Sequence, residues 1–99
     1  GTTTCGEISN NGALSNTTVI SFSSFQHTKI QTAITHYKSD SFTLGQDTIN
    51  SFNDYHYDEL KLLISFTDGL DMNGEEYLDG ISSINSNIIV SGSMAGDNA

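Results

Sequence analysis

The chain has 99 residues, of which 35% are hydrophobic, and it contains no Trp and no Pro. Its formal net charge is −9, because twelve carboxylates face only three basic residues. Nucleic acids and anionic membrane surfaces both need clustered positive charge, so we expect this chain to bind neither. No apolar run is long enough to span a membrane. We therefore expect one small domain with a thin core.

The cysteine content and the chain ends predict the context of the protein. Cys5 is the single cysteine, so no internal disulfide can form and a reducing, cytoplasmic location is expected. Both ends carry glycine-containing turns, at Gly1 to Ile8 and at Val90 to Ala99. Because glycine lets a backbone approach a ligand closely, we expect these residues to be part of a larger ligand-handling domain.

The first half of the chain predicts a turn, two strands and a helix. A polar turn at Ser9 to Gly12 precedes a predicted strand from Thr17 to Phe25. A second, half-buried strand is predicted from Thr28 to Tyr37, antiparallel to the first because the connection is short. A helix capped by Asp40 or Ser41 follows, with an inward stripe made of Phe42, Gly45, Ile49 and Phe52.

The second half predicts a β-α-β crossover. The apolar run Leu60 to Phe66 is typical of a strand covered on both faces. Asn73 and Glu76 resemble a capping box, and Ile88 to Val90 forms the next strand. The helix between them carries Tyr77, Leu78, Ile81 and Ile84 and ends at Asn85. The predicted fold class is α+β (mixed α/β), with a sheet of about five strands, two main helices and parallel strands around the crossover.

Ligands favour the carboxyl ends of parallel strands, and two glycine-bearing segments lie there. One is Asp68 to Asp71, after Phe66, and the other is Gly92 to Asp97, after Val90. Backbone N–H groups of the second segment are suited to a ligand carboxylate, and Asp68 or Asp97 to a ligand ammonium. The alternative is that both acids only cap turns or helices.

Three motifs in order resemble the N-terminal FIST domain, a sensory module of signalling proteins. They are Gly1-Thr2-Thr3-Thr4-Cys5-Gly6-Glu7-Ile8, Phe66-Thr67-Asp68-Gly69-Leu70 and Gly92-Ser93-Met94-Ala95-Gly96-Asp97. Thr2 stands where the family usually has Cys, and Ser93 where it has a second Gly. The resemblance covers the whole chain, which corresponds to about half of the family domain, so residues 1–99 are expected to be a partial domain.

The resemblance implies a domain that binds a small molecule, with amino acids proposed, and reports it to an attached output module. The remaining parts of the FIST domain and that module are the implied partners. We expect no cofactor, no metal and no catalytic residue. The predicted ligand-binding residues are Thr4, Gly6, Glu7, Asp68, Gly69, Gly92, Ala95, Gly96 and Asp97.

Other chemistries compete with this interpretation. Cys5, or a threonine among Thr2 to Thr4, provides a nucleophile for a small hydrolase-like enzyme. The acidic run from Asp68 to Glu76 lacks the alternating oxygen ligands of an EF-hand loop, and the three histidines lack zinc-ligand spacing. A third hypothesis is a dimer-forming fragment that associates through Tyr55 to Tyr57. For Glu7, the alternative to a binding role is a side chain that is simply solvated.

Overall fold

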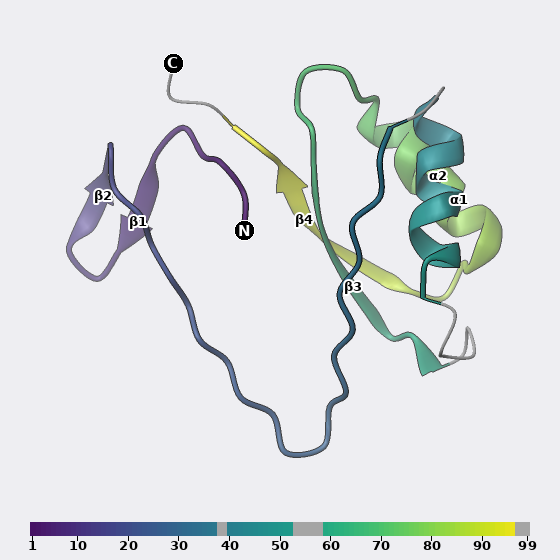
Figure 1. The fold of residues 1–99 in the computed structure, drawn as a ribbon, viewed down its shortest axis with the longest axis horizontal. Coiled ribbons are helices and arrows are strands. Elements are labelled where there is room, and N and C mark those ends of the chain that lie inside the picture. The colour runs from purple at the N-terminus through teal and green to yellow at the C-terminus, as the bar shows by residue number, and fades with distance from the viewer. Residues whose placement is uncertain (38–39, 53–58, 97–99) are drawn as a thin grey trace.

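The computed structural model describes residues 1–37, 40–52 and 59–96. Within these residues it contains two helices and two sheets of two strands each (Figure 1). The elements in chain order are β1 (Glu7–Ser9), β2 (Gly12–Leu14), α1 (Ser41–Asn50), β3 (Leu62–Thr67), α2 (Gly74–Ile84) and β4 (Ile89–Met94). The class is mixed α+β as predicted, but the sheet of about five strands is not found among the described residues.

Strand β3, helix α2 and strand β4 form the predicted crossover. β3 and β4 pair in parallel, from Leu62 opposite Ile89 to Thr67 opposite Met94. Helices α1 and α2 pack together on one side of these strands (Figure 1). The small core lies between the helices and the sheet, and its buried members are Leu44, Ile49, Leu63, Tyr77 and Ile81.

Both helices begin at the residues predicted to cap them. Asp40 is the N-cap of α1, and its Oδ1 accepts a hydrogen bond of 2.6 Å from the Thr43 N–H. Asn73 caps α2 by accepting from the N–H groups of Glu75 and Glu76 at 3.0 and 3.2 Å. A side-chain acceptor at these positions satisfies N–H groups that have no partner inside the helix. The predicted caps are confirmed, but the reciprocal bond of a capping box is not formed, because the Asn73 N–H donates to the Ser41 hydroxyl at 2.8 Å and not to Glu76.

The inward stripe of α1 is only partly as predicted. Gly45 and Ile49 are buried, but Phe42 is 39% exposed, and Leu44 and Thr48 take inward positions instead. The difference arises because α1 turns its glycine directly toward α2. In α2, Tyr77 and Ile81 are buried, whereas Leu78, which the sequence groups with them, is exposed.

A pair of glycines brings the two helices into backbone contact. A Cβ added to Gly45 would overlap the carbonyl oxygen of Tyr77 and lie 3.1 Å from the Cα of Gly80. A Cβ added to Gly80 would in turn overlap the carbonyl oxygen of Phe42. Gly45, which looks like a weak point of an isolated helix, is therefore required by the packing of α1 against α2.

The prediction that β3 is covered on both faces is wrong. Leu63 is 7% exposed and packs in the core, whereas Leu62, Ile64 and Phe66 on the opposite face are each more than half exposed. The helices cover one face of the sheet only, so the continuous apolar run does not have a second layer within the described residues.

The two strands predicted at Thr17 to Phe25 and Thr28 to Tyr37 are also wrong. Both segments run as an extended excursion without a strand ladder (Figure 1). In the second segment the hydroxyls of Thr35 and Thr48 lie 3.1 Å apart, so its polar side faces helix α1. Ile34, on its other side, is 87% exposed. Alternation indicates a strand only where a neighbouring strand and a covering layer exist to use it.

Candidate functional site

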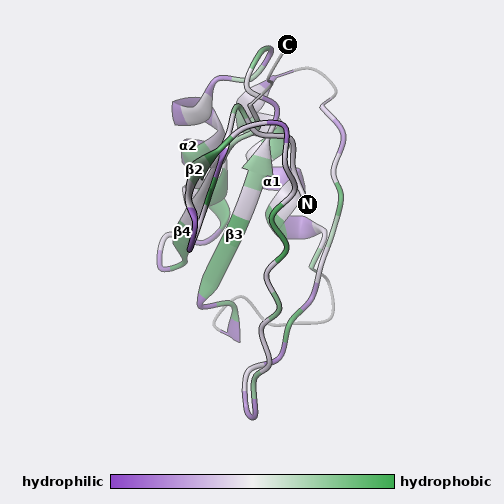
Figure 2. Cartoon of the chain, turned by 90° about the vertical axis from the view of Figure 1, so that its left-hand side faces the viewer, coloured by the Kyte–Doolittle hydropathy of each residue, from purple (hydrophilic) through white to green (hydrophobic). Residues whose placement is uncertain are grey.

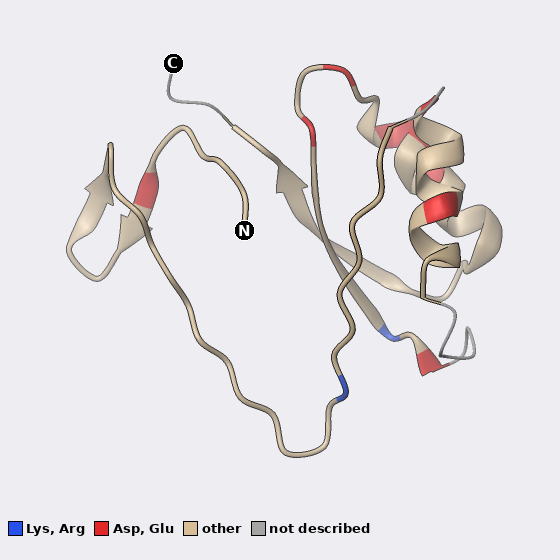
Figure 3. Cartoon of the chain, in the orientation of Figure 1, with Lys and Arg blue, Asp and Glu red and all other residues tan. Residues whose placement is uncertain are grey.

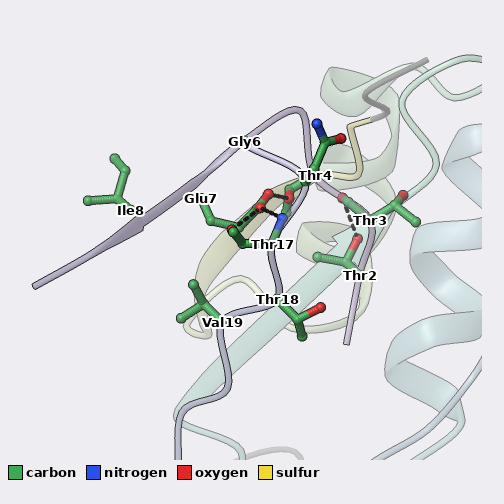
Figure 4. A pocket seen from close by; sticks show the side chains of 10 residues that line it. Thr2, Thr3, Thr4, Gly6, Glu7, Ile8, Thr17, Thr18 and Val19 are labelled. Atoms are coloured by element: carbon green, nitrogen blue, oxygen red, sulfur yellow. Dashed lines mark hydrogen bonds between the residues drawn. The ribbon is translucent and has the colours of Figure 1, made fainter. Parts of the chain in front are cut away.

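Glu7, the first residue of β1, lies at the centre of a hydrogen-bonded cluster (Figure 4). Its Oε2 accepts from the Thr4 hydroxyl at 2.5 Å. Its Oε1 accepts from both the hydroxyl and the backbone N–H of Thr17, at 2.5 and 2.9 Å. Glu7 is therefore not simply a solvated side chain, because three donors fix the position of its carboxylate.

These donors also stabilise the ionised form of Glu7. The hydroxyl of Thr17, the hydroxyl of Thr4 and the backbone N–H of Thr17 lower the pKa of Glu7 below its ordinary value of 4.5, against a small opposing effect of desolvation. Hydrogen bonds donated to a carboxylate favour its ionised form. Glu7 therefore carries a fixed negative charge at neutral pH.

The local fold explains why Thr17 meets Glu7. The predicted turn at Ser9 to Gly12 joins β1 and β2 into a hairpin that places Glu7 opposite Leu14. Asn16 then adopts a left-handed backbone conformation with φ of 55°, which asparagine tolerates better than most residues. This bend redirects the chain, so Thr17 returns to the carboxylate at the start of the hairpin.

The cluster forms one wall of an open hollow of about 590 Å³. Hydroxyl-bearing and small polar residues dominate its lining, as the close view shows (Figure 4). The lining residues are Thr2, Thr3, Thr4, Gly6, Glu7, Ile8, Asn16, Thr17, Thr18 and Val19. Thr4, Gly6 and Glu7 were predicted as site residues, and the structure brings them together here.

The glycine-bearing segment after β4 adjoins both the N-terminal segment and the turn after β3 through backbone groups. The Ala95 N–H donates to the Thr67 carbonyl at 2.6 Å, and the Gly96 N–H donates to the Thr3 carbonyl at 3.0 Å. A Cβ on Gly69 would lie 2.7 Å from the Ala95 carbonyl oxygen. The three loops are therefore neighbours, and glycine permits the close approach of the second to the third.

The other predicted site residues that the structure describes, Asp68, Gly69, Gly92, Ala95 and Gly96, do not line the hollow. Asp68 closes its own turn, since its Oδ1 accepts from the Leu70 N–H at 2.8 Å. Gly92 was predicted in a turn but lies inside β4, because the strand continues to Met94. Asp97 falls outside the described residues, as does the tyrosine cluster at 55–57. A binding role for these residues stays a prediction.

Sequence reasoning missed Thr17 and Thr18, which it assigned to the start of a strand. The signal that identifies them is a polar run directly after a glycine-containing hairpin, where the chain must turn back toward the first strand. The described residues hold no cluster of three or more His, Cys, Asp or Glu side chains that would suit a metal ion. Among the same residues, no helix has both the length and the apolar character needed to cross a membrane.

A family model described as the FIST N domain matches residues 1–99. Comparison with curated proteins and with solved structures gives no match. The match spans all three glycine-bearing segments and the hairpin that carries Glu7. The chain belongs to the FIST N domain family, whose members are sensory domains of signal transduction.

Proposed function

We propose that this domain binds a small molecule with a cationic amine, such as an amino acid, in the hollow beside Glu7. On this proposal the domain reports binding to an attached output module of a cytoplasmic signalling protein, and no residue has a catalytic role. The observation that carries the proposal is the ionised carboxylate of Glu7, which Thr4 and Thr17 hold at the wall of the hollow.

The Glu7 carboxylate retains capacity for a ligand. Each carboxylate oxygen has two lone pairs, and Oε2 accepts one hydrogen bond, from Thr4. An ammonium group is a strong donor to an ionised oxygen of this kind. The net charge of −9 attracts cationic ligands to the chain as a whole, while the position of Glu7 selects where the ligand binds.

The opposite end of an amino acid needs hydrogen-bond donors. The N–H groups of Ala95 and Gly96 already donate to Thr67 and Thr3, so they are engaged within the protein. Hydroxyl groups of the hollow are the better candidates, and Thr18 lines it together with the Glu7 cluster, whereas the Thr2 hydroxyl donates to the Thr3 carbonyl at 3.3 Å. The proposal therefore assigns the carboxylate of the ligand to threonine hydroxyls and its ammonium to Glu7.

Calorimetric titration of the chain with a panel of amino acids and simple amines tests the proposal. We expect binding of an amine-bearing ligand, weakened roughly tenfold or more in Glu7→Gln, because a charge-assisted hydrogen bond becomes a neutral one. Glu59→Gln is the matched control: it makes the same chemical change at an exposed position before β3, and we expect it to bind like the parent chain.

Backbone amide chemical shifts locate the ligand in the same titration. We expect the perturbed amides to include Thr4, Glu7 and Thr17. No binding across the panel, or equal affinity in Glu7→Gln and the parent chain, would overturn the assignment of this hollow as the ligand site.

A further inference from the structure

The two carboxylate oxygens of Glu7 are not equivalent toward a ligand. Thr17 donates to Oε1 through both its hydroxyl and its backbone N–H, at 2.5 and 2.9 Å. Thr4 donates its hydroxyl to Oε2 at 2.5 Å. Because a carboxylate oxygen has two lone pairs, Oε1 is fully occupied and Oε2 has one position left.

The same hydrogen bonds turn two hydroxyl groups into acceptors. A threonine hydroxyl has one proton and two lone pairs, and Thr4 and Thr17 give their protons to Glu7. Each of these hydroxyl oxygens therefore offers only lone pairs to a further partner. With the free position on Oε2, three neighbouring acceptor atoms belong to residues that line the hollow. A primary ammonium group has three N–H donors, which is the number that these atoms can accept.

Glu7 is also the only Asp, Glu, Lys or Arg residue among residues 1–28. In Figure 3 the hairpin carries acidic colour in β1 and no basic colour. Figure 2, in which the hairpin side faces the viewer, shows the N-terminal segment mostly in the near-white colours of small and hydroxyl-bearing residues. A cation in the hollow therefore meets one carboxylate in otherwise uncharged surroundings, and the acceptor positions around that carboxylate decide which cation fits.

Two other kinds of organic cation fit these positions poorly. A guanidinium group binds a carboxylate through a planar fork, which needs a free acceptor position on each oxygen. Oε1 has none while Thr17 is bound to it. A quaternary ammonium group has no N–H, and proteins bind it in cages of aromatic side chains. Among the described residues, no aromatic side chain lines the hollow.

We propose that the hollow selects a primary ammonium over a guanidinium and over a quaternary ammonium, with Thr17 as the specificity-determining residue. The inference rests on the proposed function and narrows its ligand class from cationic amines to primary amines. Thr17 acts by filling Oε1, so it changes which cation binds without changing the charge of the site.

Three ligands that share a carboxylate and differ in the cationic group test the inference: glycine, guanidinoacetate and N,N,N-trimethylglycine. Titrations followed at the backbone amides of Thr4, Glu7 and Thr17 give the three values of Kd. We expect glycine to bind at least roughly tenfold more tightly than either other ligand, because each of them loses charge-assisted hydrogen bonds. Equal or tighter binding of guanidinoacetate or trimethylglycine at these amides overturns the inference and leaves the proposed function standing. No perturbation by any of the three overturns the assignment of the hollow as an amine site, and the inference with it.

Variants of Thr17 separate its hydroxyl from the rest of the site. In Thr17→Val only the backbone N–H remains on Oε1, so each oxygen has a free position. We expect the preference for glycine over guanidinoacetate to fall to within about threefold. Thr17→Ser keeps the hydroxyl and should keep the preference of the parent chain. Thr32→Val, the matched control, makes the same change at an exposed position that does not line the hollow and should also keep it.

Circular dichroism establishes that each variant is folded. A folded Thr17→Val chain with the preference of the parent contradicts the role of Thr17, and so does a folded Thr17→Ser chain that has lost it. If Thr17→Val does not fold, the comparison of the three ligands in the parent chain and in Thr17→Ser still decides the inference.

Discussion

Replacing Gly45 with alanine is expected to destabilise the protein, although the same change stabilises an ordinary helix. In a solvent-exposed helix alanine is favoured over glycine by about 1 kcal/mol. Here the added methyl group would overlap the Tyr77 carbonyl oxygen and lie 2.9 Å from the backbone nitrogen of Ile81. Those obstacles are backbone atoms of α2, so the clash is relieved only if the helices move apart.

The net effect follows from the two opposing contributions. Overpacking of a close contact costs about 1–3 kcal/mol, and moving α1 away from α2 also loosens the packing of Leu44 and Ile81 in the core. After the gain in helix propensity is subtracted from these costs, we expect a net loss of about 1–2 kcal/mol in the free energy of unfolding. For a domain of this length that corresponds to a decrease in Tm of roughly 4–16 °C.

Thermal unfolding followed by circular dichroism measures this effect. Ser82→Ala, on the exposed side of α2, is the control for helix propensity and is expected to change stability by less than about 0.5 kcal/mol. Because Gly45 and Gly80 share one contact, Gly45→Ala and Gly80→Ala together should cost less than the sum of the single changes. A Gly45→Ala chain more stable than the parent would refute the close contact of the helices.

Two further predictions concern β4 and the acidic cluster. Gly92→Ala is expected to lower the free energy of unfolding, measured in urea, by about 3 kcal/mol. The reason is that Gly92 has φ of 130° and an added Cβ would overlap the backbone of β3. Ser93→Ala is the control and should have little effect. Since the pKa of Glu7 is lowered in the folded state, the stability from its hydrogen bonds is present above pH 4.5 and is lost as the pH falls below that value. Thr17→Val should raise the pKa of Glu7 toward 4.5 in a carbon-13 NMR titration, and Thr18→Val, the control, should not. If the pKa of Glu7 is the same in Thr17→Val as in the parent chain, the hydrogen bond from Thr17 to Glu7 is wrong.

Local signals in the sequence predict the helices and the crossover well. Asp40 and Asn73 cap the helices in the structure because capping depends on one side chain and the N–H groups next to it. The crossover follows from an apolar run, a periodic helix and a second apolar run, which is also a pattern over short distances. The contact between Gly45 and Gly80 is different, because nothing in either helix alone indicates that the two glycines meet.

The predictions that are wrong are those in which the structure of a segment depends on what packs beside it. Ile20 and Ile34 alternate with polar residues as strand residues do, yet both are exposed in the structure because no adjacent strand pairs with these segments within the described residues. For the candidate site, the sequence predicted Thr4 and Glu7 from a glycine turn. It did not predict Thr17, which reaches Glu7 only through the hairpin and the bend at Asn16.

The parallel pairing of β3 with β4 has a consequence for the order in which the protein folds. Leu62 cannot meet Ile89 by a simple reversal of the chain, since all of α2 lies between them. The hairpin of β1 and β2, in contrast, closes over a few residues and is expected to form within microseconds. The slow step of folding should therefore be the docking of α2. Strand β4 is expected to pair with β3 only after α2 has packed in place.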